Sequence, residues 1–155
     1  MQAAHTNADN DLKNTLEQFE TGLLSPIVPG ELSDWCGEVK TAWSAAVSLV
    51  RHHARELHPQ QYQEMSSEDP ESLPRTEKLQ EDDRSLEEEC DEFERALDRF
   101  VEHAPKFEPD EEKISKHAQT LIEAGVELVT KIRRQEAAVQ TWYVEAFTRD
   151  RGVAD

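Results

Sequence analysis

The sequence predicts an all-α protein, an up-down bundle of four helices. Three observations lead to this prediction: apolar residues recur at spacings of four and three, alternating β-branched segments are scarce, and glycine and proline gather where the apolar runs end. The chain has 155 residues, which is enough for one domain with its own core. Residues 1–155 are therefore expected to form a single helical bundle domain.

The first helix is expected from Asp9 to Leu24, and residues 1–8 before it are expected to be flexible. The helix should end at residues 25–30, which contain two prolines and a glycine, because proline lacks the N–H that continues a helix. The buried face of this helix is predicted to carry Leu12, Leu16, Phe19 and Leu23.

The second helix is expected to begin near Glu31 and to end at Pro59. Its apolar positions are Trp35, Cys36, Val39, Trp43, Ala46, Leu49, Val50 and Leu57. The aromatic residues at this spacing are expected to fill the core, and any that stay exposed would instead form a homodimer face. A polar stretch without a regular period follows, and residues 60–74 are predicted to form a long loop between the second and third helices.

The third and fourth helices repeat the same spacing. The third carries Leu79, Asp83, Leu86, Cys90, Phe93, Leu97 and Phe100, and should end near Ala104 and Pro105. The fourth carries Ile114, Ala118, Leu121, Gly125, Leu128, Ile132, Gln135, Val139, Trp142 and Ala146. A glycine at position 125 of this seam would allow a neighbouring helix to approach closely, at a cost of about 1 kcal/mol in helix propensity.

The charge of the chain argues against several classes of partner. Seventeen Lys and Arg stand against 34 Asp and Glu, and a net charge of −17 repels nucleic acid and anionic membrane surfaces. The acid-rich stretch 81–94 is expected to be a solvated helix face. The sequence shows no membrane-spanning run, signal-peptide pattern or cysteine-based metal motif, so a cytoplasmic protein with reduced thiols is expected.

Polar residues interrupt the apolar seams of three helices. In the second helix His52 and Glu56 lie one turn apart, an arrangement that lets an imidazole and a carboxylate share a metal ion. The alternative is a surface or half-buried pair, and His53 fits the apolar seam slightly better than His52. In the third, Asp83 needs a partner because an unpaired buried charge is costly, and Asp82 takes its place if the register shifts by one.

In the fourth helix Gln135 stands beside Glu136 on the chain. A glutamine on a seam is better explained as a buried amide that hydrogen-bonds across the bundle than as a metal ligand. The candidate metal ligands are therefore His52, Glu56, Asp83 and Glu136, with Gln135, His53 and Asp82 as further members of the same polar cluster.

The chain resembles the hemerythrin-like (HHE cation-binding) family, in a bacterial branch where His-x-x-x-Glu precedes a loop and a proline, and further charged helices follow. The segments that carry the resemblance are His52–Glu56, Pro70, Leu79–Asp83, Arg134–Val139 and Ala146–Gly152. The resemblance implies a four-helix bundle that, in ordinary members, holds a di-iron centre on histidines and carboxylates.

This chain departs from the family pattern at the ligand positions. Asp83 and Gln135 stand where histidines are expected, and Val139 replaces a glutamate. The resemblance therefore implies a degenerate site: a non-enzymatic binding or scaffold protein without a cofactor, whose partner is another protein or a second copy of the chain. The alternative is an iron-binding oxygen or redox sensor with a reduced ligand set. A small metal-dependent redox activity would need an open coordination position.

No other constellation suggests catalysis. The sequence lacks a Ser/His/Asp arrangement, a glycine-rich phosphate loop and a cysteine beside a histidine. We therefore expect no nucleophilic or nucleotide-dependent enzyme.

Overall fold

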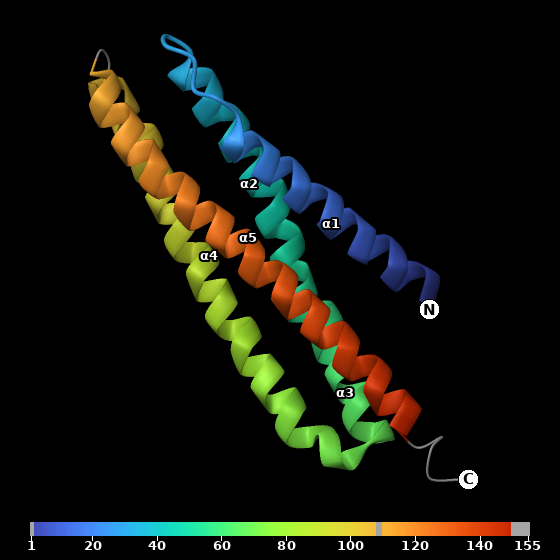
Figure 1. Ribbon diagram of the computed structural model, residues 1–155. Helices are drawn as coiled ribbons and strands as arrows, with labels where there is room; N and C mark the ends of the chain where they lie inside the picture. Colours follow the sequence, from blue (N-terminus) through green and yellow to red (C-terminus); the bar gives the residue numbers. More distant parts are fainter. Residues whose placement is uncertain (1, 108–109, 150–155) are drawn as a thin grey trace. The chain divides into compact units, whose positions relative to one another are not determined.

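The protein is an all-α bundle, as the apolar spacing predicts. The computed structural model describes residues 2–107 and 110–149, and within these ranges every regular element is helical. In chain order these are α1 (Gln2–Leu24), α2 (Leu32–His52), the π-helical turn η1 (His53–Leu57), α3 (His58–Glu68), the 3-10 turn η2 (Pro70–Ser72), α4 (Leu73–Phe107) and α5 (Glu111–Thr148). Figure 1 shows α2 continuing through η1 into α3, and α3 turning into α4.

The contacts divide the chain into two compact units, and α2, α4 and α5 each contribute to both. Unit 1 comprises Met1–Leu49 and Glu89–Val129. Unit 2 comprises Val50–Glu88 and Thr130–Asp155. None of the helices that the structure describes combines the length and apolarity needed to cross a membrane.

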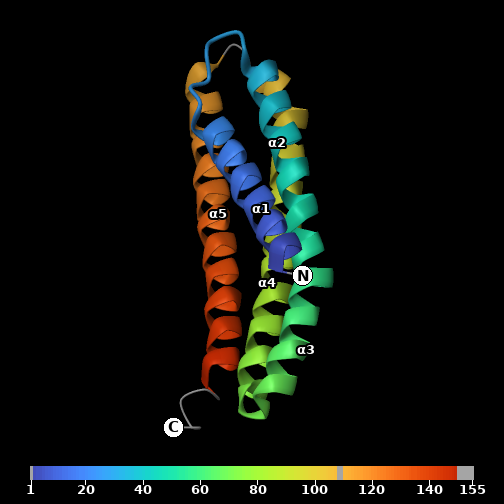
Figure 2. The same ribbon diagram turned by 90° about the vertical axis from the view of Figure 1, so that its right-hand side faces the viewer.

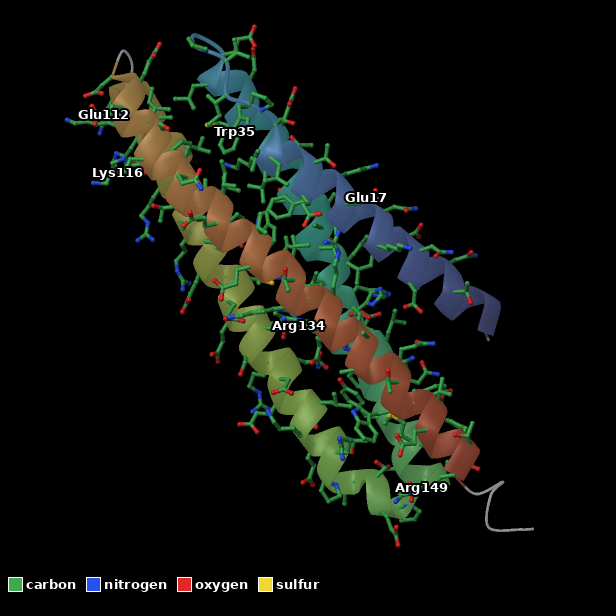
Figure 3. The ribbon with its side chains drawn as sticks, viewed as in Figure 1. Glu17, Trp35, Glu112, Lys116, Arg134 and Arg149 are labelled. Carbon is green, nitrogen blue, oxygen red and sulfur yellow. The ribbon has the colours of Figure 1, made fainter. Side chains whose placement is uncertain are left out.

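An aromatic cluster forms the core of unit 1. Phe19 of α1 lies 5.1 Å from Trp43 of α2 and 5.7 Å from Phe93 of α4, between ring centroids. Trp43 and Phe93 meet edge to face at 4.8 Å. Trp35, labelled in Figure 3, packs edge-on against Phe100. Both tryptophans of α2 therefore fill the core, as expected for aromatic residues at helical spacing.

Gly125 lies where helices of unit 1 approach one another closely, as the sequence predicts for this position. A Cβ atom at this position would lie 2.5 Å from Leu23 Cδ1 and 3.2 Å from Phe93 Cε2. The backbone of α5 is thus packed directly against side chains of α1 and α4. Figure 2 shows that α1 and α2 of the same unit are antiparallel: both helices extend downward from the connection that joins them.

The core of unit 2 is built by α3, the first part of α4 and the last part of α5. Its buried members are Tyr62, Met65, Leu79, Val139 and Ala146, and partly buried Ala138, Trp142, Tyr143 and Phe147 pack against them. The guanidinium of Arg75 lies 3.4 Å from the ring centroid of Trp142. The aromatic group near the end of α5 thus contributes to the core.

The expected loop over residues 60–74 is wrong. Helix α3 occupies the first part of this stretch, and only Asp69 and the short turn η2 separate it from α4. Pro59 does not end a helix but lies in the first turn of α3, directly after the π-helical turn η1. The buried face of α3 carries Tyr62 and Met65, three residues apart, which is a helical spacing.

The beginning of the chain also differs from expectation. Residues 2–8, expected to be flexible, belong to α1, which begins at Gln2. Its end at Leu24 is as predicted. The segment Ala146–Gly152 contributes to the family resemblance, and its residues 150–152 lie outside the described residues.

Candidate metal centre

A π-helical turn brings two histidines of unit 2 together. The N–H of His58 donates to the carbonyl of His53, five residues back, in place of the four-residue bond of an α-helix. In a regular α-helix, residues five apart point about 140° away from each other. The wider π turn removes most of this difference, and the two imidazole centroids lie 5.8 Å apart.

Pro59 gives a physical reason for this turn. In an uninterrupted α-helix its nitrogen would face the carbonyl of Arg55, but proline has no N–H to donate and its ring clashes there. Widening the helix between His53 and Leu57 accommodates the proline and lets the chain continue as α3. One residue thereby sets the position of both imidazoles.

Glu136 of α5 connects the two histidines. Its Oε2 accepts a hydrogen bond from His53 Nδ1 at 3.2 Å, and its Oε1 lies 3.0 Å from His58 Nε2. His53 and His58 are 1% and 3% exposed, whereas the Glu136 side chain is 26% exposed. Possible ligand atoms of the three residues all lie within 4.8 Å of one another. In Figure 3, the labelled Arg134 marks the part of α5 just before Gln135 and Glu136.

Asp83 of α4 lies on the other side of His58. Its two carboxylate oxygens are 3.0 and 3.1 Å from His58 Nδ1, which donates to them. The Tyr62 hydroxyl donates to Oδ2 at 2.6 Å, and the Gln135 amide donates to Oδ1 at 2.9 Å. The same amide nitrogen also donates to the carbonyl of Leu79. Asp83 thus has the partners that a buried carboxylate requires, and Gln135 serves as the amide that bonds across the bundle.

The electrostatics of this cluster favour a buried ion pair when no metal is bound. Burial lowers the pKa of His58, but the hydrogen bond of Asp83 and the charges of Asp83 and Glu136 outweigh it and raise the pKa to about 9. Burial raises the pKa of Glu136, but His53 and His58 outweigh it and lower the pKa to about 2. Burial, together with Asp83, raises the pKa of Tyr62 above its ordinary value. At neutral pH the His58 imidazolium and the Glu136 carboxylate therefore share the site.

Two buried nitrogen atoms of the cluster lack a hydrogen bond. These are Nε2 of His53 and Nε2 of His58. His58 Nε2 is close enough to Glu136 Oε1 to form an ion pair, yet the direction of its N–H does not suit a hydrogen bond. A metal ion with ligand bonds of about 2.1 Å holds neighbouring donor atoms about 3.0 to 3.4 Å apart. The contacts of 3.0 and 3.2 Å around Glu136 are those of an ion pair and a hydrogen bond, and the possible ligand atoms of the three residues lie within 4.8 Å of one another.

The donor set fits one metal ion and does not fit a di-iron centre. Within the described ranges, the group of His, Cys, Asp and Glu side chains that could hold a metal consists of His53, His58 and Glu136. Di-iron carboxylate bundles draw four carboxylates and two histidines from four helices. Two imidazoles and one carboxylate are a donor set that could hold a single ion.

The structure separates the candidate ligands predicted from sequence into two groups. Asp83, Glu136, Gln135 and His53 lie in the cluster. His52 and Glu56 lie on the surface, 46% and 71% exposed, and pair with each other at 3.2 Å. Asp82 pairs with Lys78 of the same helix. Of the two adjacent histidines, His53 is therefore the one that faces the core.

Sequence reasoning missed His58. The spacing of an α-helix predicts ligand pairs four residues apart, whereas His53 and His58 are five residues apart. The signal that could have found it is the proline directly after His58, because a proline inside a helical pattern disturbs the hydrogen bonds of the preceding turn.

Comparison of the chain with models of protein families, with curated proteins and with solved structures finds no match.

Proposed function

We propose that this protein binds one divalent transition-metal ion through His53, His58 and Glu136, and acts as a binding protein rather than an enzyme. The observation that carries the proposal is the buried, convergent set of two imidazoles and one carboxylate in unit 2. The Nε2 atom of His58 supports it, because this buried nitrogen faces Glu136 Oε1 at 3.0 Å without a well-directed hydrogen bond.

The ligand types favour iron, cobalt, nickel or zinc over magnesium and calcium. Imidazole nitrogen suits the transition metals, whereas magnesium and calcium take oxygen ligands. Two histidines and one carboxylate leave coordination positions for water or another small ligand. Iron, the metal that the family resemblance implies, belongs to this class.

Only part of the resemblance to hemerythrin-like proteins supports this proposal. The helical bundle and the positions of Asp83, Gln135 and Glu136 in one cluster agree with such an origin. His52 and Glu56, the pair that matches the family motif, point to the surface. We therefore propose a hemerythrin-like scaffold that has lost the di-iron site and keeps a smaller one made from different histidines.

A metal-free scaffold is the second candidate. It is favoured by the ion pair between His58 and Glu136, since the charges of the cluster compensate one another without a metal. In that case the role of the protein would depend on a protein partner or a second copy of the chain.

Metal titration of matched histidine variants separates the two candidates. The protein is treated with a chelator, dialysed and titrated with Co²⁺ and Zn²⁺ by calorimetry, in parallel with His58→Ala and His52→Ala. We expect one ion per chain for the wild type and for His52→Ala, because His52 lies outside the cluster. His58→Ala should bind at least about 100-fold more weakly because it removes one of three ligands.

The reverse result would favour the metal-free scaffold. If the wild type takes up no stoichiometric metal in this titration, or if His58→Ala binds as tightly as His52→Ala, the proposed site is wrong. Elemental analysis of protein expressed in iron-supplemented medium adds a measurement of the ion bound during expression.

A further inference from the structure

We infer that Asp83 is a positioning residue, which orients the imidazole of His58 toward the metal, and that Tyr62 and Gln135 hold Asp83 for this task. The inference rests on the proposed function. The sequence makes Asp83 a candidate metal ligand. In the structure it contacts the ligand His58 and does not itself belong to the ligand set.

Both oxygens of Asp83 are occupied by protein donors. Oδ1 receives Gln135 Nε2 at 2.9 Å and lies 3.0 Å from His58 Nδ1. Oδ2 receives the Tyr62 hydroxyl at 2.6 Å and lies 3.1 Å from the same imidazole nitrogen. Because donors from α3 and α5 fix the carboxylate, it cannot turn toward a metal ion without breaking several buried hydrogen bonds.

This arrangement decides which nitrogen of His58 is free to bind. A carboxylate accepts but does not donate at neutral pH, so the proton between it and His58 lies on Nδ1. The lone pair available to a metal is then the one at Nε2, which faces Glu136. Metal-binding histidines in proteins typically donate their other N–H to a carboxylate in this manner.

The second histidine lacks such support. His53 turns its Nδ1 toward Glu136, and its Nε2 has no hydrogen-bond partner. The two imidazoles therefore offer different nitrogens to the site, and Asp83 touches only one of them. An effect of Asp83 on metal binding must act through His58.

The chain contains a matched control for the experiment. Asp82 precedes Asp83 on α4, but its carboxylate contacts Lys78 on the surface. Asp83→Asn and Asp82→Asn make the same chemical change one residue apart. We expect Asp83→Asn to weaken Co²⁺ binding by about 10- to 100-fold, and Asp82→Asn to bind like the wild type.

A spectroscopic signature distinguishes positioning from a general loss of stability. In the Co²⁺ form, the Nδ1 proton of a histidine bound through Nε2 gives a strongly shifted, exchangeable proton NMR signal. We expect this signal from the wild type and from Asp82→Asn, and its loss or displacement in Asp83→Asn. Tyr62→Phe removes one donor to Asp83 and should weaken binding several-fold, which keeps the test valid if Asp83→Asn does not fold.

Each outcome decides the inference. If Asp83→Asn, folded by circular dichroism, binds Co²⁺ as tightly as Asp82→Asn and keeps the shifted signal, the positioning role is wrong while the metal site stands. If the wild type binds no Co²⁺, the proposed function fails and this inference with it.

Discussion

A single buried carboxylate, Asp83, organises the polar cluster of unit 2. It receives hydrogen bonds from an imidazole, a phenol and an amide, from residues 25, 21 and 52 positions away in the sequence. Removing one partner of such a group would leave a buried charge with fewer donors, which costs several times more than an exposed contact. By contrast, the His52–Glu56 pair on the surface contributes little, because solvent screens it.

At the residue scale we predict how the stability of the metal-free protein depends on pH. The pKa of His58 is about 9 in the folded state against an ordinary value of 6.5, so its contribution is complete below pH 6.5 and is lost as the pH rises through 9. The pKa of Glu136 is about 2 against 4.5, so its contribution is complete above pH 4.5 and is lost as the pH falls through 2. The free energy of unfolding should therefore be highest between pH 4.5 and 6.5.

Urea denaturation in the presence of a chelator, repeated from acid to alkaline pH, measures this curve. A His58→Gln variant should lack the decrease above pH 6.5, because it has no imidazole to titrate. A wild type whose stability stays level between pH 6.5 and 9 would contradict the ion pair.

At the scale of the elements, two local features determine how the helices pack: the π turn in unit 2 and the glycine contact in unit 1. The π turn places His53 and His58 on one side, which the regular spacing of an α-helix would not do. Gly125 lets α5 lie directly against Leu23 and Phe93.

We predict that Gly125→Ala destabilises the protein. A new Cβ would be forced against Leu23 and Phe93, and such overpacking typically costs about 1 to 3 kcal/mol. This cost outweighs the gain of up to about 1 kcal/mol in helix propensity. Gly37→Ala in α2 is the matched control, because its Cβ would meet nothing within 4 Å.

Chemical denaturation of both variants tests this difference. Gly37→Ala should gain up to about 1 kcal/mol, since only the propensity term acts there. The close packing around Gly125 would be refuted if both alanine variants were stabilised equally.

At the scale of the whole molecule the excess of acids dominates. The net charge is −17, and the acids of the stretch 81–94 include exposed Glu81, Glu88 and Glu92 on α4. Surface ion pairs, such as Lys40 with Asp98, are weak attractions by comparison with the repulsion among the excess carboxylates.

We predict that salt stabilises the protein. Raising the NaCl concentration from about 0.02 to about 0.2 M shortens the screening length from about 20 to about 7 Å, which weakens repulsion between exposed acids. The midpoint of urea denaturation should therefore move to higher urea in the chelated protein. A shift to lower urea would show that the attractive ion pairs outweigh the repulsion.

Much of the architecture follows from the sequence by itself. The spacing of apolar residues determined the all-α class and the buried faces, and it placed Asp83 and Gln135 on seams that the structure shows to be in contact. It also identified Gly125 as a point of close approach. These features depend on neighbours within a few helical turns, where periodicity is a direct consequence of backbone geometry.

Only the tertiary structure decided which side chains form the candidate site. His53 and Glu136 are 83 residues apart in the sequence, and His58 enters the cluster because a proline widens the preceding turn. Successive residues of a helix differ by about 100° in direction, so choosing between His52 and His53 requires the position of the partner helix. Periodicity carries no information about that position, because it is set by the packing of segments distant in the chain.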